Sequence, residues 1–275
     1  RSLRIYCRNV PAVIGAVLLL LIVSVAVLAP VLFPEDPWSM VARPLLPPGV
    51  DAAFPLGSDA LGRDIAAGLA HGARVSLMIG LVSTTIALVV GLLIGCFAGF
   101  YGGWVDQVLM RLTEIFQSTP PFILAIVLIA VVQPSLASIT TAIGIVSWPP
   151  IARLVRAEFL ALRERDFVQA AIGLGMSNSR LLLTQMLPNA LSPIIVTASL
   201  NVATAILLES GVSFLGLGDP NVMSWGYMVG AGRDVLRVAW FVTAIPGVAI
   251  LVAVMAINLM GEGLNDALNP RLSRR

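Results

Sequence analysis

The sequence contains no lysine: all 17 of its basic residues are arginines. A nucleotide-binding P-loop requires a lysine that reaches the phosphates, so this chain cannot carry an ATPase site of that kind. Enzymes that hold their substrate as a Schiff base on a lysine are excluded for the same reason. If ATP drives this protein, another chain must bind it.

Charged residues are also scarce, at 12% of the 275 residues, whereas about 25% is usual for a soluble domain. Hydrophobic residues make up 58%, and the mean hydropathy is +0.94. The formal net charge of +2 is small, and no block of basic residues suggests nucleic-acid binding. The composition therefore predicts an all-α polytopic membrane protein.

Cysteine and histidine are nearly absent, which limits the available chemistry. Cys7 precedes the first apolar run and Cys96 lies inside another, so neither is placed for a disulfide, and no metal-ligand spacing occurs. The only histidine, His71, precedes the second apolar run. An intramembrane serine protease built on Ser213 would therefore have no histidine base within the membrane. We expect no catalytic residue, bound cofactor or metal in this chain.

What the sequence does contain is long apolar runs, and about 20 residues suffice to span a bilayer as a helix. Pro120 and Pro121 interrupt the third run, where they would form either a gate element or a fixed kink. The second run carries a stripe of small residues that lets a neighbouring helix, of this chain or of a partner, approach closely: Ala87, Gly91, Gly95 and Gly99. Six runs are expected to cross the membrane: 10–33, 75–100, 105–132, 135–155, 190–212 and 239–259.

The arginines predict the orientation of these crossings. Twelve of them fall in intervals expected on one side of the membrane and five in intervals on the other. Because basic residues are enriched on the cytoplasmic side, we expect both termini and the interval after the fourth run in the cytosol. Glu209, near the outer end of the fifth run, should face a cavity or a partner, since a carboxylate at the centre of a membrane helix costs about 2.5–3.5 kcal/mol.

The longest polar interval in the second half of the chain is segment 163–188. We expect a short helix over 166–174 that Gly175 stops. A second helix over 179–187 would follow, with Ser177 or Asn178 as its cap and Pro188 at its end.

One face of the first of these helices would carry Phe167, Ala170, Ala171 and Leu174. Ala170, Ala171 and Gly175 would together form a patch of small residues that another protein's surface can approach closely. The pattern therefore favours a helix–turn–helix outside the membrane that a partner grips, with an ordinary surface hairpin as the alternative.

Segment 163–188 resembles the coupling loop of ABC-importer permeases, whose pattern is E-A-A, three residues, G, nine residues and I-x-L-P. Gln169-Ala170-Ala171, Gly175 and Leu187-Pro188 stand at those spacings, with Gln169 in place of glutamate and Gln185 where isoleucine is usual. The resemblance implies that a cytosolic ATPase docks on a set of residues in this segment: Asp166, Phe167, Gln169, Ala170, Ala171, Leu174, Gly175, Ser177, Asn178, Leu187 and Pro188.

The stretch 54–80, FPLGSDALGRDIAAGLAHGARVSLMIG, resembles the dipeptide, oligopeptide and nickel branch of that family. In this branch L-G-T-D-x-L-G-R-D leads into G-A-R-x-S-L, and Ser58 here replaces the usual threonine. The stretches 214–218, 224–226 and 258–272 resemble the same branch. A tight external loop, which packs the outer surface or meets a binding protein, would cap a helix that starts near residue 64; its residues are Gly57, Asp59, Gly62, Arg63 and Asp64.

The resemblance implies a six-helix permease with a type I ABC-importer (MetI-like) core over 54–275, preceded by the first helix and the start of an external loop over 1–53. Such a subunit forms half of a pore in the cytoplasmic (inner) membrane. Its implied partners are a homologous second permease, two cytosolic ATPases that bind ATP and Mg²⁺, an extracellular substrate-binding protein and membrane lipid. Short peptides are the expected substrate, with nickel complexes or other small solutes as the alternative.

Two further interpretations remain open on the sequence. An ion-coupled secondary transporter would need ionisable residues near the middle of the membrane and an inverted repeat. Glu209 lies near a helix end, and no convincing internal repeat occurs. A purely structural membrane subunit is the other interpretation.

Overall fold

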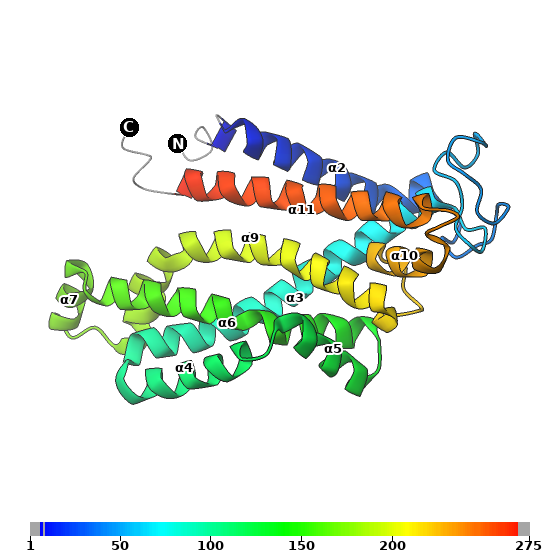
Figure 1. Cartoon of the computed structure of the whole chain (residues 1–275). Helices are drawn as coiled ribbons and strands as arrows, with labels where there is room; N and C mark the ends of the chain where they lie inside the picture. Colours follow the sequence, from blue (N-terminus) through cyan, green and yellow to red (C-terminus); the bar gives the residue numbers. More distant parts are fainter. Residues whose placement is uncertain (1–5, 8, 269–275) are drawn as a thin grey trace.

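The computed structural model describes residues 6, 7 and 9–268, and these are arranged almost entirely as helices that run between two ends of the molecule (Figure 1). In the described part of the chain, five helices are long and apolar enough to cross a membrane, and the number is six if a bent pair of helices forms one crossing. The five are α2 (Val10–Leu32), α3 (Ile65–Tyr101), α6 (Leu136–Arg163), the continuous helix Asn178–Leu217, and α11 (Phe241–Leu268). The predicted all-α polytopic fold is confirmed, and five to six candidate membrane helices agree with the expected number of crossings.

The central pair of helices is α3 and α6, and the small-residue stripe explains why they pack so closely. A Cβ atom built on Gly95 would lie 2.6 Å from the Val155 Cβ atom, and one on Gly99 would lie 2.6 Å from the Phe159 Cβ atom. Glycine therefore allows the backbone of α3 to contact the side chains of α6. The sequence did not show whether the helix packed on this stripe belongs to this chain or to a partner; it is α6 of the same chain.

The third crossing is broken rather than kinked. Helices α4 (Gly103–Gln117) and α5 (Pro121–Val132) meet at 82°. Pro121 occupies the first position of α5, where its missing N–H is harmless, and it forces Pro120 into an extended conformation with ψ 131°. The single helix expected over 105–132 is thus corrected to two helices.

The fifth crossing begins earlier than expected, because Pro188 does not end the second helix of segment 163–188. Helix α8 (Asn178–Arg180) leads through a π-helical turn, η1 (Leu181–Met186), directly into α9 (Leu187–Val212), in which Pro188 is the second residue. A proline ring crowds the carbonyl four residues earlier, and the wider π turn just before it relieves that conflict. A second π turn, η2 (Ser213–Leu217), closes the crossing.

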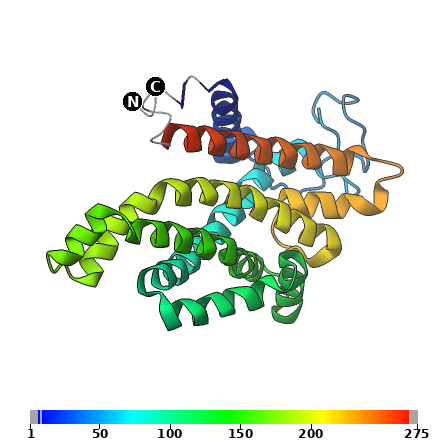
Figure 2. The ribbon, with the colours of Figure 1, turned by 60° about the vertical axis from the view of Figure 1, so that its left-hand side comes forward.

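The two ends of the molecule differ in what they carry (Figures 1 and 2). Helix α7 (Asp166–Gly173) lies at one end, where α2 begins and α11 finishes. Loop 33–64, the short helix α10 (Trp225–Gly232) and its one-turn extension η3 (Arg233–Val235) lie at the other end. The N-terminal arginines at positions 1, 4 and 8, and those at 271, 274 and 275, lie outside the described residues, so their predicted side stays a prediction.

Candidate functional site

Helix α7 begins and ends where the sequence predicts. Arg165 precedes it in an extended conformation, and Gly175 follows it with φ +75°. The N–H of Gly175 donates to the carbonyl of Ile172 (2.9 Å), and the N–H of Met176 donates to the carbonyl of Ala171 (3.1 Å). This pair of hydrogen bonds is the Schellman motif, which satisfies the last carbonyls of a helix and favours glycine in the left-handed conformation.

The two faces of α7 have different partners. Val168 is fully buried and Ala171 is 8% exposed, so these two side chains hold α7 against the rest of the chain. Phe167 (41% exposed), Ile172 (50%) and Leu174 (88%) point away from it. Ala170 is exposed as well, so Phe167, Ala170 and Leu174 share an outer face as expected. The expectation for Ala171 is corrected: it belongs to the inner face.

Ile172 is the residue of the outer surface that the sequence pattern missed. It stands five residues after Phe167, outside the three- and four-residue spacing that predicts a shared helical face. Its exposure arises because α7 packs on α6 and η1 along only one side, through Val168 and Ala171.

The Gln169 side chain ties α7 to the preceding helix. Its amide nitrogen donates to the carbonyl of Arg163, the last residue of α6, at 2.7 Å. An ionised glutamate, which the family pattern has at this position, only accepts hydrogen bonds and could not make this one. Glutamine is therefore the residue type that suits this contact.

Ser177 precedes α8 in an extended conformation, as a cap residue does, but its side chain makes no capping hydrogen bond. Asn178 is exposed and begins α8, while Leu187 and Pro188 lie inside the continuous helix rather than at its end. The predicted docking residues thus fall into two groups. Residues from Asp166 to Asn178 form one protruding unit, and Leu187 and Pro188 lie two helical turns further along the crossing.

The opposite end carries the residues predicted in the external loop. Glycines there allow separate backbone segments of loop 33–64 to contact each other. Gly57 (φ +78°) and Gly62 (φ +81°) adopt the left-handed conformation. A Cβ atom on Gly57 would lie 2.1 Å from the Leu46 carbonyl oxygen, and one on Gly62 would lie 2.2 Å from that of Ala42. Only glycine fits at either position, so these residues have a structural role.

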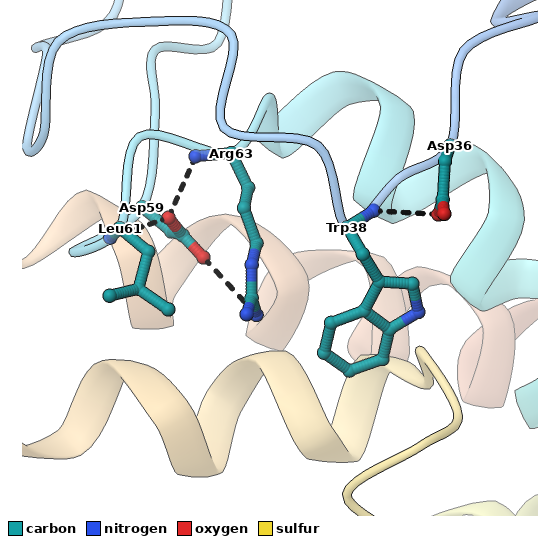
Figure 3. A network of polar contacts seen from close by, with 5 residues as sticks. All are labelled: Asp36, Trp38, Asp59, Leu61 and Arg63. Atoms are coloured by element: carbon teal, nitrogen blue, oxygen red, sulfur yellow. Dashed lines mark hydrogen bonds and ion pairs between the residues drawn. The ribbon is translucent and has the colours of Figure 1, made fainter.

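Asp59 and Arg63 organise a polar network in this loop (Figure 3). The Asp59 carboxylate accepts hydrogen bonds from the backbone N–H groups of Leu61 (2.8 Å) and Arg63 (2.9 Å). The Arg63 guanidinium lies 4.6 Å from the centre of the Trp38 ring and 3.9 Å from the Asp59 carboxylate. Trp38 also packs edge-on against Tyr227 of α10, so the network fixes the loop to α10.

Asp64 caps α3, as the sequence predicts. Its carboxylate accepts a hydrogen bond from the N–H of Ala66 at 2.9 Å. Partial burial raises the pKa of this carboxyl group, and the hydrogen bonds from Ala66 and Ala67 only partly oppose that effect. The cap therefore holds a carboxylate that is less well solvated than in water.

Glu209 is buried at the end of the molecule that carries α10, with 1% of its surface exposed. One carboxylate oxygen accepts hydrogen bonds from the hydroxyls of Ser213 (2.8 Å) and Ser224 (2.7 Å). A Cβ atom on Gly226 would lie 2.7 Å from both carboxylate oxygens, so glycine is needed there. Glu209 therefore fastens α10 to α9: it is shielded from lipid, but by residues of its own chain rather than by the cavity or partner that the sequence led us to expect. Among the described residues no group of three His, Cys, Asp or Glu side chains converges to hold a metal.

Comparison with known proteins gives matches along the whole chain. Residues 91–274 match the family model described as binding-protein-dependent transport system inner membrane component, and residues 1–48 match the N-terminal transmembrane domain of oligopeptide transport permease C. The di/tripeptide transport system permease protein DppC of Pseudomonas aeruginosa is 42% identical over 97% of this chain and 90% of its own length. The dipeptide transport system permease of Haemophilus influenzae is 36% identical, over 97% and 92%.

Solved structures support the same architecture. The MetNI methionine ABC transporter in an inward-facing conformation aligns with a TM-score of 0.60 at 20% identity, over 74% of this chain and 96% of the matched chain. An amino acid ABC transporter solved with histidines aligns with a TM-score of 0.52 at 17% identity, over 73% and 90%. At these identities the likeness concerns the fold alone.

Proposed function

Because the chain belongs to the family of binding-protein-dependent transport system inner membrane components, we propose that it forms half of the pore of an ATP-driven importer of short peptides. The family consists of transport permease subunits, and the curated relatives that match nearly the full chain are named for di/tripeptide, dipeptide or peptide transport. These names favour peptides over nickel complexes or other small solutes.

The remaining parts of the machine follow from membership of this family. A homologous second permease completes the pore, two cytosolic ATPases hydrolyse ATP with Mg²⁺, and an extracellular binding protein delivers the peptide. This chain is the non-catalytic part and binds no cofactor, which agrees with its lack of a P-loop lysine. It lies in the cytoplasmic membrane with both termini in the cytosol.

The observation that carries the proposal is the outer face of α7. Three large apolar side chains, Phe167, Ile172 and Leu174, project from a segment that also carries Arg163, Glu164, Arg165, Asp166 and Arg180. A segment this charged does not suit the hydrocarbon of a bilayer, and exposed apolar groups rimmed by polar ones are typical of a protein–protein contact. A groove on the ATPase is the partner surface that suits this face.

Docking on this face allows the ATPase to move the helices that form the pore. Full burial of one phenylalanine or leucine side chain contributes about 1.5–3 kcal/mol. The ATPase changes the preference between two membrane conformations only if it binds α7 differently in each of them. Val168, Ala171 and the Gln169 hydrogen bond join α7 to α6 and η1, so a displacement of α7 is transmitted to the fourth and fifth crossings.

A cross-linking experiment tests the docking directly. In a variant without Cys7 and Cys96, Leu174→Cys is joined by a short bifunctional reagent to its nearest neighbour in the native complex. Val238→Cys, which is 81% exposed in the link between η3 and α11, is the matched control. We expect a product with an ATPase subunit from position 174 alone. Absence of that product, or an ATPase product from position 238, would refute the proposal.

Glu209 gives little support to the alternative that the chain is an ion-coupled secondary transporter. An ion-coupling carboxylate must be reached by the ion, whereas Glu209 is 1% exposed and is engaged by Ser213 and Ser224. Its contacts join α9 to α10, which is a packing role.

A further inference from the structure

We propose that the end of the molecule nearest α7 holds one anionic phospholipid, with its two acyl chains on either side of a ridge formed by Leu93, Phe97 and Tyr101. This site does not use the outer face of α7, although Asn178 and Leu187, two of the predicted docking residues, line its first groove. It requires only that the chain is embedded in a membrane, so it can be tested separately from the transport function.

Two apolar grooves lie side by side on α3 and share this ridge. The first, of about 450 Å³, lies between α3 and the start of the fifth crossing, and Leu182, Leu183 and Leu187 form its far wall. The second, of about 430 Å³, lies between α3 and α4, with Trp104, Val108 and Leu109 opposite the ridge. Two adjoining grooves of nearly equal size match a lipid with two acyl chains better than they match a single helix.

The ridge is open and aromatic. Phe97 and Tyr101 stack with their ring centres 6.0 Å apart and their planes 7° from parallel. Phe97 is 45% exposed, Tyr101 is 51% exposed, and Trp104 next to them is 74% exposed. Tyrosine and tryptophan at the end of a membrane helix are typical of the level of the lipid head groups, so acyl chains extending from that level would run along both grooves.

The Arg163 side chain places a positive charge next to the end of the ridge. The guanidinium of Arg163 reaches the turn after α3, where a Cβ atom on Gly102 would lie 3.0 Å from its terminal nitrogen. In the described part of the chain, no carboxylate lies within ion-pair distance of Arg163. The polar residues Asn178 and Ser179 line the first groove. An arginine without a carboxylate partner, next to Tyr101 at the end of the ridge, suits a phosphate, which accepts charge-assisted hydrogen bonds.

The charge also favours a lipid over a second protein as the occupant. Cytosolic leaflets contain anionic lipids that arginines near the membrane surface attract, and Arg163 lies in the segment predicted to be cytosolic. The grooves themselves contain no charged side chain that a protein partner could pair with.

Native mass spectrometry of the purified transporter complex tests the site. The complex is delipidated in a mild detergent and titrated with dioleoyl phosphatidylglycerol or with dioleoyl phosphatidylcholine. We expect one retained phosphatidylglycerol per copy of this chain, with about a fivefold preference over phosphatidylcholine, the contribution of one arginine near an anionic head group. Equal retention of the two lipids would overturn the proposal.

Variants separate the head group from the acyl chains. Arg163→Gln should abolish the preference, and its backbone carbonyl still accepts the Gln169 hydrogen bond. Phe97→Ala should lower the retention of both lipids. The matched controls Arg237→Gln and Trp240→Ala replace an exposed arginine and an exposed aromatic residue at the opposite end. Both controls should behave as wild type, and a control that loses the lipid as the test variants do would contradict the assignment.

One more outcome would overturn the proposal. Val108 is 45% exposed in the second groove, so Val108→Cys lies in the path of one acyl chain. A cross-link from this position to the second permease would show that a protein covers the ridge. We expect no such product.

Discussion

At the scale of single residues, most positions that the sequence singled out have a local physical reason that the structure makes visible. Gly175 provides a left-handed conformation, Asp64 caps α3, and Gln169 donates a hydrogen bond that a glutamate could not. Helix stops and caps depend on neighbours within a few residues, which is why sequence alone locates them. Burial depends on the whole fold, and for that reason the prediction for Ala171 failed.

Gly175 gives the first prediction at this scale. Nothing lies within 4 Å of a Cβ atom built there, so a substitution acts through backbone strain alone. Gly175→Ala should weaken the Schellman motif by about 1 kcal/mol, or about fivefold in local opening. Hydrogen exchange of the Met176 amide, which bonds to the Ala171 carbonyl, measures this opening. Gly175→Asn should show a smaller effect because asparagine tolerates this conformation, and equal exchange in all three proteins would contradict the account.

Asp64 gives a prediction on pH. Its pKa is raised chiefly by burial, so the folded chain binds the proton more tightly than the unfolded chain does. Ionisation therefore costs stability above the raised pKa, and that cost disappears as the pH falls through it. Asp64→Asn keeps the cap acceptor without the charge, so it should be more thermally stable than wild type at pH 8. The advantage should shrink toward the ordinary aspartate pKa of about 3.9.

The control for this prediction is Asp51→Asn, which removes the charge of an exposed loop aspartate whose carboxylate likewise accepts a backbone hydrogen bond, from Ala53. Thermal unfolding of the purified complex over pH 4–8 compares the three proteins. A stability difference between Asp64→Asn and wild type that does not vary with pH would show that the charge of Asp64 is not responsible.

At the scale of elements, the sequence predicted which segments are helical better than where they bend. Pro120 and Pro121 indicated an interruption, yet the 82° angle between α4 and α5 depends on the packing of α5, where Ala125 and Ile129 are fully buried. Pro188 indicated a helix end, but the π turn before it lets the helix continue. Such turns form when the surrounding structure compensates for them, which no short sequence pattern reveals.

The two faces of α7 give a prediction at the element scale. Ala170 is exposed and Ala171 is 8% exposed, so the same substitution has different effects at adjacent positions. Ala171→Glu would place a charge against α6 and η1 and should lower the amount of folded chain in the membrane. Ala170→Glu should leave that amount unchanged and weaken ATPase retention.

Membrane yield and co-purified ATPase, measured on both variants, check this prediction. If Ala170→Glu retained the ATPase as wild type does, the outer face would not be the docking surface. If Ala171→Glu accumulated normally, the assignment of the inner face would be wrong.

At the scale of the whole molecule, the number of crossings and their order followed from apolar length and arginine placement. Which end faces the cytosol is a prediction that the arrangement makes testable: α7 and α10 lie at opposite ends (Figure 1), Leu174 directly follows α7, and Val238 follows α10 and η3. The seal around Glu209, by contrast, brings together residues from α9, η2 and α10. Sequence placed Glu209 near the outer end and away from lipid, but it did not identify Ser213, Ser224 and Gly226 as its contacts.

Orientation is tested by cysteine labelling in intact cells. In a background without the native cysteines, Val238→Cys should react with a membrane-impermeant maleimide, and Leu174→Cys should react only after the cells are permeabilised. Both side chains are strongly exposed, so accessibility of the side chain itself does not limit the reaction. Labelling of position 174 in intact cells would invert the predicted orientation.

The central claim is that an ATPase moves this pore through the outer face of α7, and the peptide transported per ATP hydrolysed measures that coupling. Leu174→Ser is the sharpest variant, because a side chain that is 88% exposed contributes little to the chain's own fold. Loss of its burial should weaken docking by about tenfold or more. In proteoliposomes containing the complete transporter, the account predicts that peptide uptake per ATP hydrolysed falls well below the wild-type ratio while the chain remains inserted. Unchanged uptake per ATP in Leu174→Ser would contradict it.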